Sequence, residues 1–229
     1  MSMKRTLLAL AMLAAAAALV PSASAGVMNV TFWQTSDPGG IGDPEEQALP
    51  TNPMAAGTPL ANFIYNGDLN WTSFLGSDNY LDDFVGTGGG SVSGCAGVAC
   101  TNATTLGHYL LSTSGFELTS LFRIIFTTTG PVINGEITHD DGASIFDSTN
   151  TIAYLDASFP TAAITSNFSL PGAGTYNLWY VEANGHPSVL QVSGDITEQS
   201  VPEPGALALI GFALMSLFGF GWMRRRAGI

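Results

Sequence analysis

Apolar and polar side chains alternate along residues 116–127, and this period of two fits a β-strand rather than a helix. One predicted face carries Phe116, Leu118, Phe122, Ile124 and Phe126, and the other carries Glu117, Thr119, Arg123 and Thr127. The run ends at Gly130-Pro131, a pair that is typical of a turn. The pattern therefore predicts one long strand in the middle of the chain.

Other short runs rich in aromatic and β-branched residues predict further strands. These runs cover residues 27–34, 136–139, 143–146, 167–170, 175–182 and 188–192. Asn184-Gly185 is a turn signal, so we expect the last two strands to pair as a hairpin.

The remaining segments of the body are rich in Gly, Pro and Asp and predict little regular structure. Residues 38–59 are expected to be irregular, residues 63–84 to mix loop and short strand, and residues 86–97 to form a loop. The sequence therefore predicts an all-β fold, an antiparallel β-sandwich or barrel with almost no helix.

The N-terminal segment has the three parts of a secretory signal. Lys4 and Arg5 give it a positive start, residues 7–20 are apolar, and Ala23-Ser24-Ala25 forms a small-residue cleavage site. Residues 1–25 are therefore predicted to be a signal peptide that signal peptidase removes. The alternative, an uncleaved membrane anchor, is disfavoured because the apolar run is short and is followed at once by Pro21.

The C-terminal segment has the length and composition of a membrane-spanning helix. Residues 205–223 carry no charge. The length of this run is close to the ~20 residues that a helix needs to cross ~30 Å of hydrocarbon. Arg224, Arg225 and Arg226 follow, and such basic clusters stay on the cytoplasmic side. A buried core helix is the alternative, but the run is apolar on every face. We therefore expect the part of the chain before this helix to be exported across the inner membrane, with only residues 224–229 on the cytoplasmic side.

The motif Val201-Pro202-Glu203-Pro204, the apolar run and the arginine cluster together resemble the PEP-CTERM sorting signal of Gram-negative bacteria. The resemblance implies that residues 201–229 are read by an exosortase, a membrane-embedded transpeptidase that cuts near the motif. It also implies a final place at the cell surface or outside the cell. Both prolines disfavour a helix and keep the motif extended.

Residues 26–200 form the predicted exported domain, which is long enough to bury one sizeable core. All 18 acidic residues of the chain lie between Asp37 and Glu203, where Arg123 is the only basic residue. Nucleic acid is excluded as a partner, because neutralising phosphate needs Lys and Arg. Surplus carboxylate favours divalent cations, neutral ligands or simple solubility.

Cys95 and Cys100 are the only cysteines and lie in the same Gly-rich stretch. An even pair in an exported protein predicts a disulfide. A metal site is disfavoured because no further Cys or His ligands lie nearby, and a redox role because the spacing is not Cys-x-x-Cys.

A second resemblance covers residues 116–194. It is carried by Asp140-Asp141-Gly142, by Gly174-Thr175-Tyr176-Asn177-Leu178, and by the segment from Tyr180 to Gly185. The order and spacing of these motifs are similar to those of a PA14-type domain, a β-sandwich of toxins, glycosidases and fungal adhesins. The implied fold is PA14-like or jelly-roll-like.

The PA14 resemblance also implies a ligand site. Lectin-like members bind calcium through two adjacent aspartates and an asparagine, and the ion takes two sugar hydroxyls. The matching residues are Asp140, Asp141 and Asn184, with a cis peptide bond between the aspartates. Calcium prefers oxygen ligands of this kind. The alternative is a plain turn at Asp140-Asp141-Gly142 that needs no ligand.

The residues alone suggest two further candidate sites. His139 and His186 with Asp140 form a plausible zinc or copper set. Glu136, Asp140 and Asp147 offer carboxylates of the kind used in glycoside hydrolysis.

Because no catalytic motif is present, we expect no enzyme. The sequence favours a structural or interaction protein at the cell surface. The alternative is a calcium-dependent, carbohydrate-binding adhesin module whose partner is extracellular polysaccharide.

Overall fold

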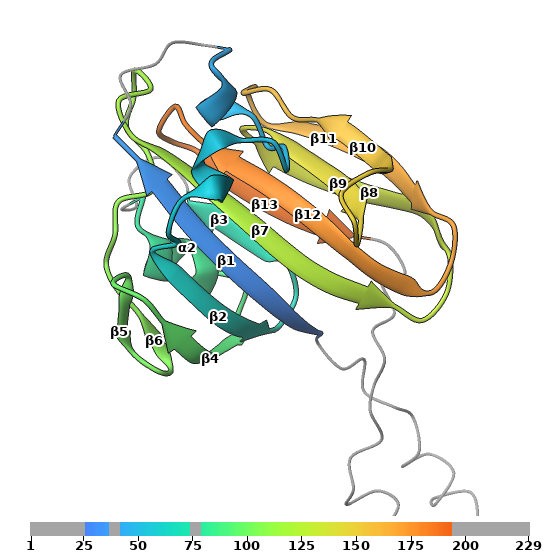
Figure 1. Cartoon of the computed structure of the whole chain (residues 1–229), viewed down its shortest axis with the longest axis horizontal. Helices are drawn as coiled ribbons and strands as arrows, with labels where there is room; N and C mark the ends of the chain where they lie inside the picture. The colour runs from blue at the N-terminus through green and yellow to red at the C-terminus, as the bar shows by residue number, and fades with distance from the viewer. Residues whose placement is uncertain (1–25, 37–41, 74–78, 194–229) are drawn as a thin grey trace, which may run out of the picture. The chain divides into compact units, whose positions relative to one another are not determined.

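The computed structural model describes residues 26–36, 42–73 and 79–193 (Figure 1). The predicted signal peptide, the sorting motif at 201–204, the apolar run at 205–223 and Arg224 to Arg226 lie outside the described residues. Within the described ranges, no helix has both the length and the apolar character needed to cross a membrane.

The described residues form thirteen strands, and each strand pairs with its neighbours in the antiparallel direction. They are β1 (Val27–Thr35), β2 (Ala61–Asn66), β3 (Asn70–Ser73), β4 (Ser91–Ala96), β5 (Cys100–Asn102), β6 (Thr105–Leu106), β7 (Thr119–Thr128), β8 (Val132–Asp140), β9 (Ala143–Asp147), β10 (Ala153–Ala157), β11 (Ile164–Leu170), β12 (Gly174–Glu182) and β13 (Ser188–Ser193). Three short helices accompany them: η1 (Pro44–Glu46), η2 (Pro53–Ala56) and α2 (Leu81–Gly86).

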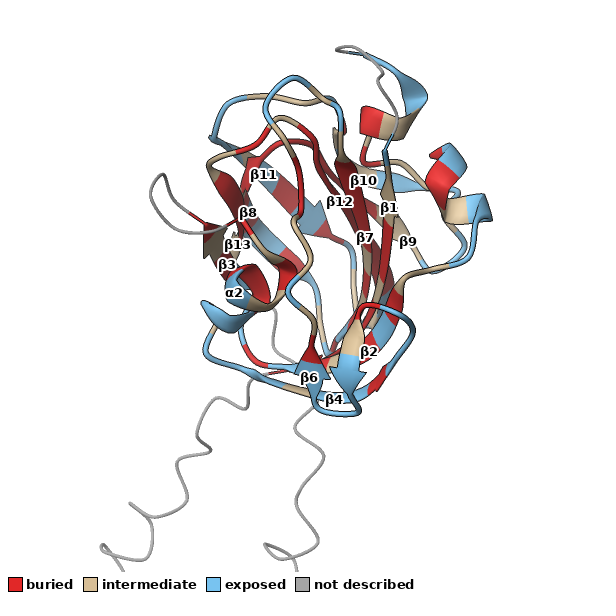
Figure 2. Ribbon diagram, turned by 90° about the vertical axis from the view of Figure 1, so that its left-hand side faces the viewer, coloured by how far each residue is buried: buried red, intermediate tan, exposed pale blue. Residues whose placement is uncertain are grey.

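The strands form two facing sheets and a small ribbon. One sheet has seven strands in the order β10-β9-β12-β7-β1-β2-β4, and the other has four in the order β11-β8-β13-β3. The ribbon pairs β5 with β6. The predicted all-β antiparallel sandwich is therefore confirmed. Figure 2 shows the buried residues gathered between the two sheets.

Aromatic side chains dominate the core between the sheets. Trp71 on β3 lies edge-on to Tyr65 on β2, with ring centroids 5.1 Å apart, and contacts Phe84 of α2 at 5.7 Å. Phe122 on β7 lies 5.8 Å from Tyr180 on β12. All five side chains are fully buried. Each large apolar side chain buried in this way contributes roughly 1.5–3 kcal/mol.

A smaller apolar cluster covers the other face of the seven-stranded sheet. Trp33 on β1 stacks on Trp179 of β12, with ring centroids 6.1 Å apart. Ala48 and Met54, from the segment that carries η1 and η2, pack against this pair. Arg123 lies over the ring of Trp179, 5.9 Å from its centroid. The outer face of this sheet is therefore partly covered rather than open to solvent.

The long strand predicted after Phe116 begins later than expected. Phe122, Ile124 and Phe126 do lie buried in the core, but Phe116 has a positive φ of 64° and precedes β7. Leu121, on the face predicted to be polar, is fully buried in the outer cluster. The alternation therefore located the strand but missed the second covered face.

Two other expectations for local structure were wrong. Residues 86–97 do not form only a loop, because β4 spans Ser91–Ala96 and pairs with β2. The strand β10 was not predicted, because its sequence, Ala-Tyr-Leu-Asp-Ala, lacks clear alternation. Both strands lie at edges of the larger sheet.

The expected hairpin between residues 175–182 and 188–192 does not form. Both edges of β12 are taken, one by β7 and the other by β9, so β13 has no edge to join in that sheet. Instead β13 inserts between β8 and β3 in the four-stranded sheet. Asn184-Gly185 therefore lies on a connection between sheets.

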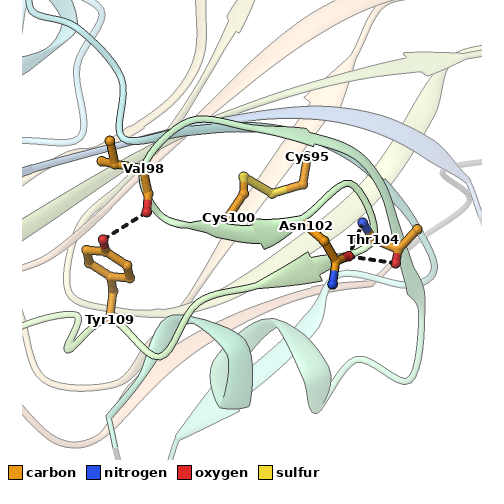
Figure 3. Close-up of a disulfide and its surroundings, with 6 residues drawn as sticks. All are labelled: Cys95, Val98, Cys100, Asn102, Thr104 and Tyr109. Atoms are coloured by element: carbon orange, nitrogen blue, oxygen red, sulfur yellow. Dashed lines mark hydrogen bonds between the residues drawn. A yellow bond between two sulfur atoms is a disulfide. The ribbon is translucent and has the colours of Figure 1, made fainter.

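The predicted disulfide is confirmed, and Figure 3 shows it between the end of β4 and the start of β5. The Sγ atoms of Cys95 and Cys100 are 2.04 Å apart. The hydroxyl of Tyr109 donates to the carbonyl of Val98 at 2.9 Å, so the tip of the ring is also attached to the chain that follows it. The Gly-rich stretch is thereby held against the sheet.

Candidate functional site

Two connections pass from one sheet to the other at the same end of the sandwich. Residues 141–142 join β8 to β9, and residues 183–187 join β12 to β13. The strand register brings them together, because Asp140 pairs with Val189 in one sheet and Ala143 pairs with Tyr180 in the other. We call these two segments the paired connections.

Asp141 links the paired connections through its side chain. Its Oδ2 atom accepts hydrogen bonds from the backbone N–H groups of Ala183 at 2.7 Å and Asn184 at 3.1 Å. The peptide bond between Asp140 and Asp141 is cis, as the PA14 resemblance implies. The fold therefore places Asp140, Asp141 and Asn184 at one corner, although they are distant in sequence.

Both aspartates are buried, whereas Asn184 is partly exposed. Asp140 is 2% exposed and Asp141 is fully buried. The connection between β10 and β11, residues 158–163, lies against them. A Cβ atom on Gly142 would come within 2.1 Å of the Ser158 carbonyl oxygen, so only glycine fits there. The corner is thus closed on one side by backbone.

Burial perturbs both carboxyl groups. It raises the pKa of Asp141 to about 7, against the opposing hydrogen bond from Ala183, and the neighbouring charge of Asp140 raises it further. Burial also raises the pKa of Asp140 to about 6, and the backbone N–H of Ala163 acts in the opposite direction. Removal from water is therefore the main reason that these groups resist ionisation.

The oxygen atoms at this corner are suitable ligands for a hard cation. The Oδ1 atom of Asp141 is buried and has no hydrogen-bond partner of normal geometry. Arg123, the only Lys or Arg of the exported part, lies over Trp179 on the outer face. Buried carboxylates are costly unless a positive charge pairs with them. Carboxylate and amide oxygens are ligands that calcium prefers, so the residues present suit this ion.

The zinc or copper set is not supported by the contacts of its histidines. Nδ1 of His139 lies 2.6 Å from the carbonyl oxygen of Asp141, and its Nε2 lies 3.0 Å from Oγ of Ser166. Both ring nitrogens are therefore engaged. His186 lies on the connection to β13, and its Nδ1 is 3.3 Å from Oγ of Ser73.

Nor do the candidate glycosidase carboxylates come together. Asp147 pairs with Tyr176, four positions along β12 from the Tyr180 that marks the corner. At about 3.3 Å per residue this is roughly 13 Å, beyond the ~5–9.5 Å of catalytic pairs. Its carboxylate accepts from the N–H groups of Thr151 and Ile152, which lower its pKa. Glu136 lies on β8 in the other sheet and is exposed.

Sequence reasoning missed a buried polar network behind the aspartates. Glu182 is fully buried, and its Oε1 accepts from Oγ of Ser112 at 2.7 Å. The hydroxyl of Tyr180 lies 2.9 Å from Oε2 of Glu182 and 2.5 Å from the carbonyl oxygen of Asp140. Burial raises the pKa of Glu182 well above its usual range. A single acid near the end of the apolar run Tyr-Asn-Leu-Trp-Tyr-Val was the available signal.

A second group of ligand-type residues was also missed. Asp82 and Asp83 on α2 lie near His108, with the three ligand atoms within 4.8 Å of one another. Nδ1 of His108 is 3.0 Å from Oδ1 of Asp82, and its ring stacks on Tyr80 at 3.6 Å. All three side chains are substantially exposed. The ion pair and the ring stack account for this arrangement.

Comparison with known families matches the C-terminal segment. The PEP-CTERM protein-sorting motif matches residues 200–226. The chain carries a PEP-CTERM motif. This match confirms the motif that the sequence indicated, and it implies an exported protein that an exosortase processes. No curated protein sequence matches the chain.

Two solved structures similar to the chain are both PA14 domains, the family that residues 116–194 resemble. The PA14 domain of the MpAFP antifreeze protein is 15% identical, with a TM-score of 0.48 over 80% of this chain and 88% of that one. The PA14 sugar-binding domain of an RTX adhesin is 15% identical, with a TM-score of 0.47 over 74% of this chain and 95% of that one.

Proposed function

We propose that the protein is an interaction module delivered to the cell surface or extracellular matrix by its PEP-CTERM motif, and that it binds carbohydrate through a calcium ion. Asp140, Asp141 and Asn184 hold the ion. The single observation that carries the proposal is the buried Oδ1 atom of Asp141, which has no hydrogen-bond partner of normal geometry, at a corner where none of the described residues is a Lys or Arg. A cation supplies the missing charge.

Each residue of the corner has a distinct part. The N–H groups of Ala183 and Asn184 hold one oxygen of Asp141 and leave the other for the ion. Asp140 adds a second buried carboxylate, and the partly exposed Asn184 offers an amide oxygen. When bound, the ion supplies positive charge that fixes two neighbouring hydroxyl groups of a sugar. No bond is made or broken, so the protein acts as a binding module and not as an enzyme.

Export and sorting follow from the two ends of the chain. Residues 1–25 act as the signal peptide, and residues 205–223 hold the protein in the inner membrane until the exosortase cuts near Pro202-Glu203-Pro204. The processed protein is then at the cell surface or released. A purely structural surface protein, in which Asp140-Asp141-Gly142 only makes a turn, is the competing function.

Thermal unfolding of the exported protein in EDTA and in millimolar calcium distinguishes the two functions. Calcium at ~100 times its dissociation constant should stabilise the folded state by about 2.7 kcal/mol. Magnesium should do so less, because it keeps its waters and demands a stricter octahedral geometry. An unfolding midpoint that does not respond to calcium would leave the structural role as the better account.

A further inference from the structure

The connection between β10 and β11 forms a rim over the two buried aspartates. At one end, the Ser158 carbonyl lies against Gly142, where a Cβ atom would be only 2.1 Å away. The same carbonyl accepts from the N–H of Ala48 at 2.9 Å, and the Ser158 hydroxyl donates to Asp156 at 2.8 Å. Further along, the backbone N–H groups of Thr161 and Ala163 face the carboxylates of Asp141 and Asp140. Both ends of the rim are therefore fixed beside the corner.

Between these fixed points, Phe159 is left in solvent. Its side chain is 59% exposed, and it is the one aromatic among the exposed large apolar side chains of the described ranges. Ile164, which follows the rim and pairs with His139, is 50% exposed. Pro160 comes directly after Phe159 and stiffens the backbone there. An exposed aromatic on a rigid segment beside a polar corner is typical of a recognition surface.

The charge of the residues around the rim limits the classes of ligand that can bind there. Residues 157–181, which include the rim, contain no charged residue and no histidine. The whole chain has a net charge of −12, and the exported part offers only Arg123, which lies over Trp179. An acidic polymer would therefore meet repulsion without a compensating cation from the protein. A ligand here must present hydroxyl groups to the ion and an uncharged, partly apolar face to the rim.

We infer that the rim selects neutral pyranose sugars, with Phe159 stacking on the C–H face of a ring whose hydroxyl groups the corner holds. This inference rests on the proposed function, since the hydroxyl groups are held through calcium. Phe159 is then a specificity residue: it contacts the sugar and does not touch the ion. The two contributions are separable, because the corner supplies polar contacts and the rim supplies apolar area.

The test measures retention of the full-length exported protein on immobilised dextran, mannan and galactan, which are neutral, and on hyaluronan, which is acidic. Each surface is run in calcium and in EDTA. We expect calcium-dependent retention on at least one neutral polymer and none on hyaluronan. Phe159→Ala should weaken that retention about tenfold, while Phe159→Trp should keep it.

Ile133→Ala is the matched control, because it removes an exposed apolar side chain from the opposite end of β8 and should change nothing. The calcium-induced rise in the unfolding midpoint should be the same in wild type and Phe159→Ala. If wild type shows no such rise, the calcium site itself fails. If the rise is present but no neutral polymer is retained, or hyaluronan is retained instead, or Phe159→Ala binds as wild type does, the assignment of a neutral sugar to this rim is wrong.

Discussion

The side chain of Asp141 accepts a hydrogen bond from the backbone N–H of Asn184 at 3.1 Å, across the space between two connections that join different pairs of strands. This contact joins residues that are 43 positions apart in the chain. It leaves the other carboxylate oxygen of Asp141 buried without a normal partner. The consequences of this arrangement are open to direct measurement.

Asp141→Asn should remove most of the stabilisation that calcium gives. The amide keeps the size of the side chain and one oxygen for the N–H groups of Ala183 and Asn184, but it loses the negative charge that the ion needs. Calcium titration followed by thermal unfolding measures the loss. Asp68→Asn makes the same change at an exposed turn and should retain the full calcium response. Equal responses in the two variants would argue against a site at Asp141.

In EDTA, stability should fall as the pH rises from about 4 to about 7. Asp140 and Asp141 have pKa values raised to about 6 and about 7 by burial, so the folded state binds protons more tightly than the unfolded chain, where the aspartate pKa is about 3.9. Their stabilising effect is full below the unfolded value and is lost as the pH passes the folded values.

Unfolding midpoints at pH 4.5 and 7.5, with EDTA or calcium, measure this pH effect. The lowered pKa of His139 acts in the opposite sense below about pH 6.5, so the informative quantity is the difference between wild type and Asp141→Asn. Calcium should abolish most of the fall, since it stabilises the ionised carboxylates. A wild-type profile identical to that of Asp141→Asn would show that Asp141 does not titrate as proposed.

Glu182→Gln should be tolerated, whereas Glu182→Ala should not. A glutamine can accept from Ser112 at one position and donate to the Tyr180 hydroxyl at the other, which preserves the network. Alanine removes the Glu182 oxygens that accept from both hydroxyl groups and opens a buried cavity, at a cost of roughly 2–5 kcal/mol. Urea unfolding of the two variants compares them. A glutamine variant as unstable as the alanine variant would mean that Glu182 acts through its charge.

The disulfide should be fully formed after export. Alkylation of the unreduced protein should label neither Cys95 nor Cys100, and labelling should appear only after reduction. Because the closed ring is short, replacing both cysteines by serine should cost at most about 2 kcal/mol. Mass spectrometry and thermal unfolding give the two readouts. Complete labelling without a reductant would contradict the expectation.

Glu203→Ala should block sorting in a host that has an exosortase. The wild-type protein should lose its C-terminal segment, whereas the variant should accumulate in the inner membrane with Arg224, Arg225 and Arg226 still attached. Glu198→Ala, which changes an acid outside the Pro-Glu-Pro motif, is the control and should be processed normally. Mature wild-type protein that still ends in Arg-Arg-Arg-Ala-Gly-Ile would exclude processing near the motif.

Local sequence patterns predicted where the strands lie better than they predicted which strands pair with one another. The alternation around Phe122, Ile124 and Phe126 located β7, because a strand buried on one face repeats every two residues. A local pattern does not show which strand edges are free. The Asn184-Gly185 turn signal therefore predicted that β13 pairs with β12, although β7 and β9 occupy both edges of β12. Pairing in this fold depends on contacts distant in sequence.

The site was predictable only as far as its residues carry a motif. Asp140, Asp141 and Asn184 were named from the PA14 resemblance, and the fold places Asp141 beside Asn184. Glu182 lies in the segment from Tyr180 to Gly185 that carries this resemblance, but the resemblance gave it no role. The Ser112 that binds it and the rim around Phe159 have no motif of their own. They take part because the strand register and the crossing connections bring them there, and no property of their local sequence records this.

The two ends of the described body emerge on the same side of the sandwich. β1 starts at Val27, and β13 runs from Ser188, next to the paired connections, to Ser193 at the far end (Figure 1). Both chain exits therefore lie at one end of the sandwich, and Asp141 lies at the opposite end. Shortening or lengthening the chain at either exit should leave the corner around Asp141 unaltered. The same corner can therefore form whether the protein is anchored in a membrane or released.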